Sequence, residues 1–149
     1  NSSKILQTIK SRCLYFKVTL SQEESIDIFN KIIDKDIHSL INNDLISHYF
    51  TPGDLINLYT FSLEKKIDLS KMKLEEFLIE IIDNHYYKKD ILSINLIFAF
   101  LQMYFIKKIN NLDNYSVYSK FVNSIDDIKR FNLDIESLFI QLRHQIVND

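Results

Sequence analysis

From residue 21 onwards, apolar residues recur at the spacing of amphipathic helices. The first predicted helix covers 21–35. It begins at Ser21 with Glu24 three residues later, a capping-box pattern in which the two side chains satisfy free backbone amides of the first turn. A second, shorter helix is predicted over 38–48. Its expected inward-facing residues are Leu40, Ile41, Leu45 and Ile46.

The third predicted helix begins at Thr51 and Pro52 and ends near 65–66. Thr is a favoured N-cap, and Pro is tolerated at the first helical position because its missing N–H would have no partner there. The polar stretch 68–70 is the best candidate for a module boundary. Beyond it we predict four longer helical segments, over about 70–86, 90–109, 115–130 and 134–147.

Residues 5–20 follow a different pattern from the rest of the chain. They read as a short helical turn followed by a strand, because 14–19 is the only stretch rich in β-forming residues. A single strand is not stable alone, so this one needs a partner strand from elsewhere. We therefore expect an all-α fold in three parts: a short N-terminal stub that carries a strand (1–20), a three-helix module (21–67) and a C-terminal helical bundle (68–149).

The composition favours the helical class and excludes several others. The 149 residues include one Gly, one Pro and no Trp, against 11 Phe and 8 Tyr. Tight hairpins, β-sandwiches and dinucleotide-binding folds need several glycines for positive-φ turns and close backbone approach. A phosphate-binding loop of the form GxxxxGKS/T needs two. The composition therefore excludes most of these folds and a complete enzyme built on such a loop.

The charge balance and the single cysteine limit the kinds of partner and the cellular compartment that we expect for this protein. Eighteen Lys and Arg against 20 Asp and Glu give a net charge of −2, which is too balanced for a general nucleic-acid binder. The sequence contains no run of 18 uncharged apolar residues, so we expect no membrane span. Cys13 cannot form an internal disulfide, which fits a reducing compartment. We expect a cytoplasmic protein.

Few side chains form a catalytic or metal-binding pattern. The four histidines are scattered, without an HExxH motif or a second cysteine, so we expect no metal site and no cofactor. We interpret the acidic residues of the 70–86 segment as a solvated face rather than an acid–base pair. These residues are Glu75, Glu76, Glu80 and Asp83.

Large apolar residues surround most of the 90–109 segment, which predicts its burial within a bundle or at an interface. The residues concerned are Phe98, Phe100, Leu101, Tyr104 and Phe105.

Cys13 is expected to be packed rather than nucleophilic.

The most specific feature is the segment 4–13, which reads KILQTIKSRC. It resembles the ILPTIxSRC segment of clamp-loader subunits in the AAA+ ATPase family. In that family the Arg of the Ser-Arg-Cys motif, which corresponds to Arg12 between Ser11 and Cys13, projects into the nucleotide site of the neighbouring subunit. A guanidinium is planar and permanently charged, so it can stabilise charge on a γ-phosphate during transfer. The resemblance implies that Arg12 is an arginine finger acting in trans.

The same family continues with a short strand, a three-helix lid and a helical collar, which is the order predicted here. Its lid carries a GSPGRAL-type segment, whose Arg senses nucleotide. The chain has FTPGDLI at 50–56, so Pro52 and Gly53 match but Asp54 stands at the Arg position. A carboxylate repels a triphosphate, and this difference argues against ATP hydrolysis by the subunit itself. The segment 132–138 resembles the start of the last collar helix.

The resemblance is to the C-terminal part of the delta-prime subunit family of the bacterial DNA polymerase III clamp loader. It implies a non-hydrolysing stator of the replicative polymerase holoenzyme, without enzymatic activity or cofactor of its own. Its partners would be the motor (gamma/tau) and delta subunits, with ATP on a neighbouring subunit, primer–template DNA only in the full complex, and no membrane. Two alternatives stay open: a fragment of the motor subunit, and an all-helical protein-interaction module unrelated to replication.

Overall fold

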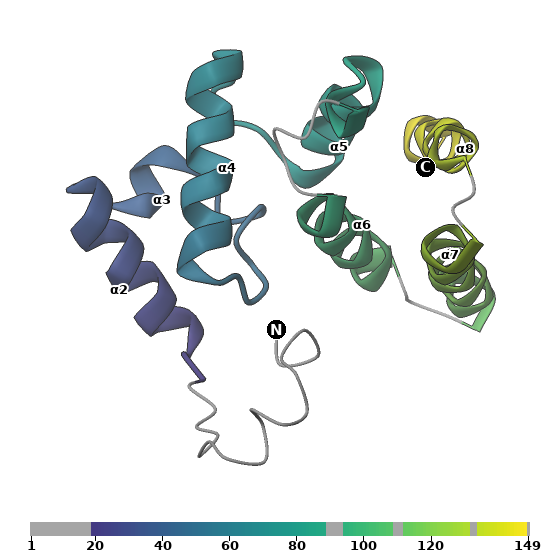
Figure 1. Ribbon diagram of the computed structural model, residues 1–149, viewed down its shortest axis with the longest axis horizontal. Helices are drawn as coiled ribbons and strands as arrows, with labels where there is room; N and C mark the ends of the chain where they lie inside the picture. Colours follow the sequence, from purple (N-terminus) through teal and green to yellow (C-terminus); the bar gives the residue numbers. More distant parts are fainter. Residues whose placement is uncertain (1–18, 89–93, 109–111, 132–133, 149) are drawn as a thin grey trace, which may run out of the picture.

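The computed structural model describes residues 19–88, 94–108, 112–131 and 134–148. Over these residues the chain is all-helical, with seven α-helices, one 3₁₀ turn and no strand (Figure 1). The predicted all-α class is confirmed. The predicted strand falls almost wholly on residues outside the described ranges, and Thr19 and Leu20 lead into the first described helix without regular secondary structure.

The predicted first helix is confirmed as α2 (Gln22–Ile33). Ser21 Oγ accepts the N–H of Glu24 at 3.1 Å, and Glu24 Oε2 accepts the N–H of Ser21 at 2.7 Å, so the capping box forms as the sequence indicates. The helix ends at Asp34, which takes the left-handed conformation with φ 57°. That conformation usually belongs to Gly, and Asp is among the few other residues that adopt it readily.

The predicted helix over 38–48 is wrong beyond its first turn. The observed helix, α3 (Ile37–Leu40), has four residues, and a loop follows it. In that loop Asn42 Oδ1 accepts the N–H of Asp44 at 3.0 Å, and the Asn42 N–H donates to the distant carbonyl of Leu69 at 2.9 Å. Asn side chains compete with the helix for backbone groups, which ends the helix early. Three of the four apolar residues predicted to face inward are nonetheless buried: Ile41, Leu45 and Ile46.

The third predicted helix is confirmed as α4 (Pro52–Lys65), with Thr51 as N-cap and Pro52 in the first turn. Its end is fixed by Lys66, also left-handed at φ 57°, whose N–H donates to carbonyls of the last turn. α4 packs against α2, and Phe29 and Tyr59 meet edge to face with ring centroids 5.9 Å apart.

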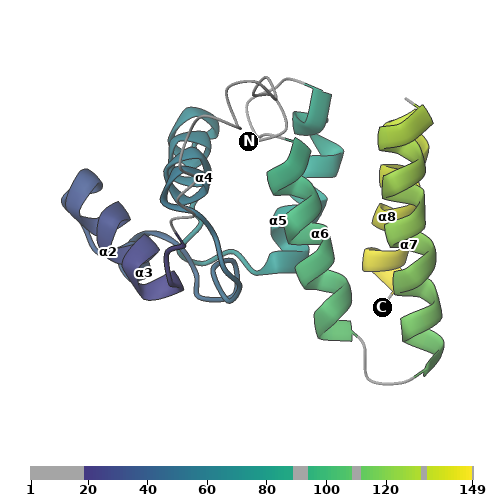
Figure 2. The ribbon, with the colours of Figure 1, turned by 60° about the horizontal axis from the view of Figure 1, so that its bottom comes forward.

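The second half contains α5 (Leu74–Asp83), a 3₁₀ turn η2 (Tyr86–Lys88), α6 (Ile94–Lys108), α7 (Leu112–Phe131) and α8 (Ile135–Asn148). Four helices were predicted here, in this order. The first is shorter than expected, because Asp68 Oδ1 accepts both the N–H and the hydroxyl of Ser70 and holds that stretch in a turn. α5 lies against both α6 and α8, and α6 lies against α7 (Figure 2).

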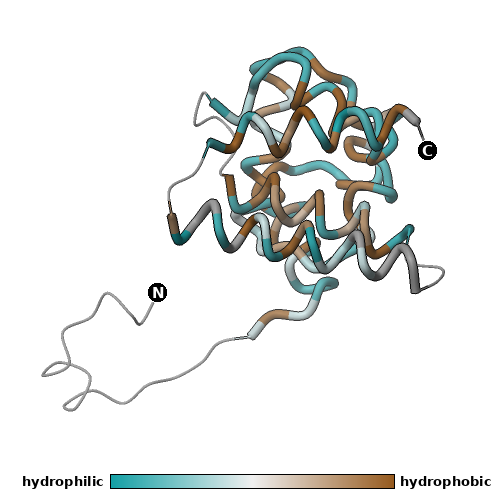
Figure 3. The backbone as a smooth tube through the Cα atoms, turned by 90° about the vertical axis from the view of Figure 1, so that its right-hand side faces the viewer, coloured by the Kyte–Doolittle hydropathy of each residue, from teal (hydrophilic) through white to brown (hydrophobic). Residues whose placement is uncertain are grey.

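The side chains on α6 are buried as predicted. Phe98, Phe100, Leu101, Tyr104 and Phe105 are each at most 4% exposed. Most helices carry apolar residues on one side and polar residues on the other, visible as alternating colours in Figure 3. α6 is different, since residues on most of its circumference are buried, and it therefore lies inside the structure.

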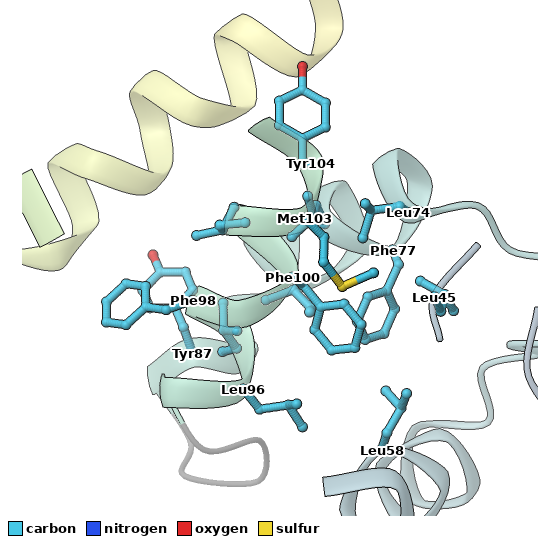
Figure 4. Close-up of a cluster of buried hydrophobic side chains, with 14 of the residues drawn as sticks. Leu45, Leu58, Leu74, Phe77, Tyr87, Leu96, Phe98, Phe100, Met103 and Tyr104 are labelled. Atoms are coloured by element: carbon cyan, nitrogen blue, oxygen red, sulfur yellow. The ribbon is translucent and has the colours of Figure 1, made fainter. Parts of the chain in front are cut away.

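A chain of aromatic contacts joins α4, α5 and α6 at the centre, and Figure 4 shows its middle pair, Phe77 and Phe100. The rings of Phe77 and Phe100 lie 5.0 Å apart at 71°, Phe50 lies 5.2 Å from Phe100, and Phe61 lies 6.2 Å from Phe77. Such edge-to-face and tilted pairs add roughly 0.5–1.5 kcal/mol each beyond the area they bury. The first three helices and the last four thus share one core.

No helix within the described ranges is both long enough and apolar enough to cross a bilayer.

We predict that Phe77→Ala lowers the free energy of unfolding by about 3–5 kcal/mol, because it removes a fully buried ring from the centre of the aromatic chain. Urea unfolding followed by circular dichroism measures the change. Phe131→Ala is the matched control: this ring is 59% exposed, so its removal should cost less than about 0.5 kcal/mol. Equal losses for the two variants would contradict the described core.

Candidate functional site

The predicted trans arginine finger lies outside the described residues. Ser11, Arg12 and Cys13 all fall within 1–18, so the role of Arg12 stays a prediction. The segment that can be compared with the resembled family is the start of α4, at Thr51 to Asp54. The structure describes all four of these residues.

Asp54 belongs to the cap of α4. Its Oδ2 accepts the Thr51 hydroxyl at 2.7 Å and the Thr51 N–H at 3.3 Å, while Thr51 Oγ1 accepts the Asp54 N–H at 3.2 Å. A carboxylate at this place also interacts favourably with the positive end of the helix dipole. An ionised carboxylate accepts hydrogen bonds and donates none, so Asp54 cannot bind a phosphate as an arginine would. Its observed role is to start a helix.

Gly53 has no structural need to be glycine. Its φ is not positive, and a Cβ added to it would meet only Thr51 Oγ1, at the ordinary contact distance of 3.8 Å. Neither a left-handed turn nor a close backbone approach requires the missing side chain. Pro52 is explained by its place in the first turn of α4, but the glycine that follows it is not explained by the packing of the described residues.

Asp44 joins the two halves of the chain, which the sequence did not reveal. Its Oδ2 accepts the N–H of Leu74 at 2.9 Å, and its Oδ1 accepts a hydrogen bond from Lys107 Nζ. Lys73 occupies the N-cap position of α5, and a lysine side chain has no acceptor with which to cap a helix. Asp44 supplies the missing cap from 30 residues away.

The surroundings of Asp44 favour its ionised form. Partial burial raises the pKa of the carboxyl, but three effects outweigh it: the hydrogen bond from Lys107, the hydrogen bond from the Leu74 N–H and the positive charges of Lys107 and Lys73. The pKa of Asp44 therefore lies below its ordinary value of 3.8. The side chain is 31% exposed, so water still reaches the pair and weakens it.

A second polar cluster fastens α8 to α5 and η2. Arg143 donates to both carboxylate oxygens of Asp83, and Lys88 Nζ lies 2.8 Å from Glu136 Oε2. The hydrogen bond from Arg143 holds the pKa of the Asp83 carboxyl below its usual value. The same elements also meet through the rings of Tyr87 on η2 and Phe139 on α8, which are tilted by 30° with centroids 4.3 Å apart. The two ion pairs are partly exposed and the ring pair is buried, and all three contacts hold α8 against α5 and η2.

The acidic face predicted on α5 is present, and its carboxylates have structural partners. Glu76 Oε2 accepts the Lys73 N–H at 2.8 Å, and Glu80 Oε1 accepts the side-chain amide of Asn84 at 2.9 Å. Glu76 and Asp83 are exposed, and Glu75 and Glu80 are half-buried. Helix caps and side-chain pairs account for Glu76, Glu80 and Asp83 without an acid–base role.

The histidines within the described ranges are also separated. His38 Nδ1 pairs with Asn43 Oδ1 at 2.6 Å, and His85 Nδ1 pairs with the Tyr87 hydroxyl at 2.9 Å. Among the described residues, no three His, Cys, Asp or Glu side chains converge on a point where they could hold a metal ion.

Comparison of the chain with protein-family models, with curated proteins and with solved structures found no match.

We predict that Gly53→Ala raises the free energy of unfolding by about 0.4–1 kcal/mol, because it reduces the freedom of the unfolded chain without strain in the helix. Chemical denaturation at neutral pH measures the change. A clear loss of stability would show that the start of α4 cannot accept a Cβ and that the described geometry is wrong.

We predict that Asp44→Ala lowers the free energy of unfolding by about 0.5–2 kcal/mol, the usual cost of losing an N-cap. Asp44→Asn should cost less, since an amide oxygen can still accept the Leu74 N–H. Asp27→Ala, on the exposed side of α2, is the control and should have little effect.

The contribution of Asp44 should also depend on pH. Its pKa is lower in the folded than in the unfolded protein, so the stabilisation is complete above the unfolded value near 3.8 and is lost as the pH falls through the lower folded value. The difference between wild type and Asp44→Asn should therefore be constant near neutral pH and shrink in acid. A difference that grows in acid would contradict this assignment.

Proposed function

We propose that the chain is the C-terminal part of a delta-prime-like clamp-loader subunit, and that it helps to load sliding clamps during DNA replication. In this proposal residues 1–20 end the ATPase core, 21–67 form the lid and 68–149 form the collar. Arg12 acts on ATP held by a neighbouring motor subunit. The subunit hydrolyses no ATP itself.

The observation that carries the proposal is the ten-residue segment 4–13, with Ser-Arg-Cys at its end. Two features of the described residues support it. Helices follow in the expected order, three before the turn at Asp68–Ser70 and four after it. The FTPGDLI segment also starts a helix, as a lid segment would, and lies at the expected place in that order.

Asp54 favours the stator over the motor subunit. A motor subunit is expected to present an arginine to its own nucleotide at this position. Asp54 instead accepts hydrogen bonds from Thr51 at the start of α4, and a carboxylate there would oppose triphosphate binding. A subunit with this residue can assist its neighbour's hydrolysis through Arg12 without needing to bind nucleotide through its lid.

The second candidate is an all-helical interaction module without a role in replication. It is favoured by large apolar side chains that α7 and α8 expose within the described residues. Phe131, Ile140 and Val147 are 57–62% exposed, and a partner that covered them would remove apolar surface from water. The two candidates differ in their partner: clamp-loader motor subunits for the first, an unrelated protein for the second.

We predict that Arg12→Ala, in the full-length protein assembled with its motor and delta subunits, lowers the DNA-stimulated ATPase rate by about 10³-fold or more at that one site. Assembly should be unchanged, because the collar is intact. Arg12→Lys should be impaired as well, since an ammonium lacks the planar, multiply donating geometry. Steady-state phosphate release and size-exclusion chromatography measure the two properties.

Arg130→Ala is the matched control, since Arg130 is exposed on α7 and contacts only the neighbouring ring of Phe131 among the described residues. It should leave the ATPase rate unchanged. An unaltered rate in an assembled complex that carries Arg12→Ala would remove Arg12 from the mechanism. Failure of the wild-type protein to assemble with motor subunits would instead reject the clamp-loader proposal and favour the interaction module.

A further inference from the structure

A small pocket opens between α7 and α8, with α6 beneath it. Its volume is about 130 Å³. Four buried apolar side chains form its floor: Phe105, Phe121, Leu138 and Leu142. The rings of Phe105 and Phe121 are tilted against each other, with centroids 4.3 Å apart, which gives the floor a fixed shape.

The rim of this pocket is polar and carries one positive charge. It consists of Lys120 and Ser124 on α7 and Gln141 and Gln145 on α8. The Ser124 hydroxyl donates to the carbonyl of Lys120. Within the described residues, Lys120 has no ion-pair partner and neither glutamine side chain has a hydrogen bond, and no carboxylate lines the pocket. The rim therefore offers three side chains that can donate hydrogen bonds.

We propose that this pocket binds one apolar side chain of an amphipathic helix from another protein, and that a carboxylate one turn away on that helix pairs with Lys120. Three features fit this occupant. The volume is well below the roughly 300–1,000 Å³ of sites that enclose whole ligands, so it suits a single side chain. The pocket opens between two neighbouring helices, α7 and α8 (Figure 1 and Figure 2), and a third helix can lie along such a pair. An apolar floor with a polar rim is the arrangement of an interface anchor.

The positive charge of Lys120 selects among partner helices by the charge of the residue beside their anchor. A carboxylate beside the anchor gains an ion pair and hydrogen bonds from the rim, whereas a lysine at the same place is repelled by Lys120 and finds no acidic residue in the pocket lining. The partner is thus an acidic amphipathic helix with Leu or Phe as its anchor. This inference does not rest on the clamp-loader assignment, because it uses only residues 105–145.

The experiment uses the 149-residue protein as bait for a phage library of helical peptides with randomised faces. Selection on wild type is compared with selection on Ser124→Phe, which fills the pocket from its half-buried rim. We expect wild type to enrich peptides with Leu or Phe and an Asp or Glu three or four residues away. No enrichment above the Ser124→Phe background, or enrichment of lysine beside the anchor, would overturn the proposal.

An enriched peptide is then tested by fluorescence anisotropy against charge variants. Lys120→Glu should weaken its binding about tenfold and should prefer the same peptide with Lys in place of the acidic residue. Lys31→Glu is the matched control, because Lys31 is exposed on α2, and its affinity should equal that of wild type. Equal affinities for Lys120→Glu and wild type would overturn the charge assignment.

Two further measurements keep the test decisive. Circular dichroism melting shows whether Ser124→Phe remains folded, and Gln141→Trp, at an exposed rim position, replaces it if it does not. Sedimentation of the protein alone shows whether a second copy fills the groove. Self-association that Ser124→Phe abolishes would identify the occupant as another copy of this chain and would overturn the proposal of a different partner.

Discussion

The contact of Phe77 with Phe100 is the interaction on which the rest of the structure depends. It joins α5 to α6, and each ring continues the chain of contacts, Phe77 to Phe61 on α4 and Phe100 to Phe50 in the loop before α4. The helices α2–α4 and the helices α5–α8 therefore share one buried core rather than meeting across a hydrated boundary. A chain with so few glycines and prolines obtains its shape from helix packing, and large rings supply much of that packing energy.

Elements with local signals could be predicted from the sequence. The pair Ser21 and Glu24 predicted the start of α2, and the pair Thr51 and Pro52 predicted the start of α4. The apolar residues around Phe100 predicted the burial of α6. For α2 and α4 the decisive groups lie within three residues of one another, and for α6 they lie on a single helix. Helical spacing also predicted the order of the later helices.

Elements that depend on distant residues could not be predicted in this way. The helix expected over 38–48 stops at Leu40, and the loop that follows is fixed in part by a hydrogen bond from Asn42 to Leu69. The start of α5 was misplaced, because its capping carboxylate is Asp44, far back in the sequence. Two residues carry the functional prediction. The structure describes the contacts of Asp54, whereas Arg12 lies outside the described residues.

The cap that Asp44 provides makes the folding of the two halves interdependent. It joins residues 30 positions apart, and its ion pair with Lys107 spans 63 positions. A polypeptide emerging from the ribosome therefore completes this loop only after the end of α6 has been synthesised. Contacts of such long range cost chain entropy to close, and they raise the contact order of the fold. We expect the chain to unfold as one cooperative unit rather than in two steps.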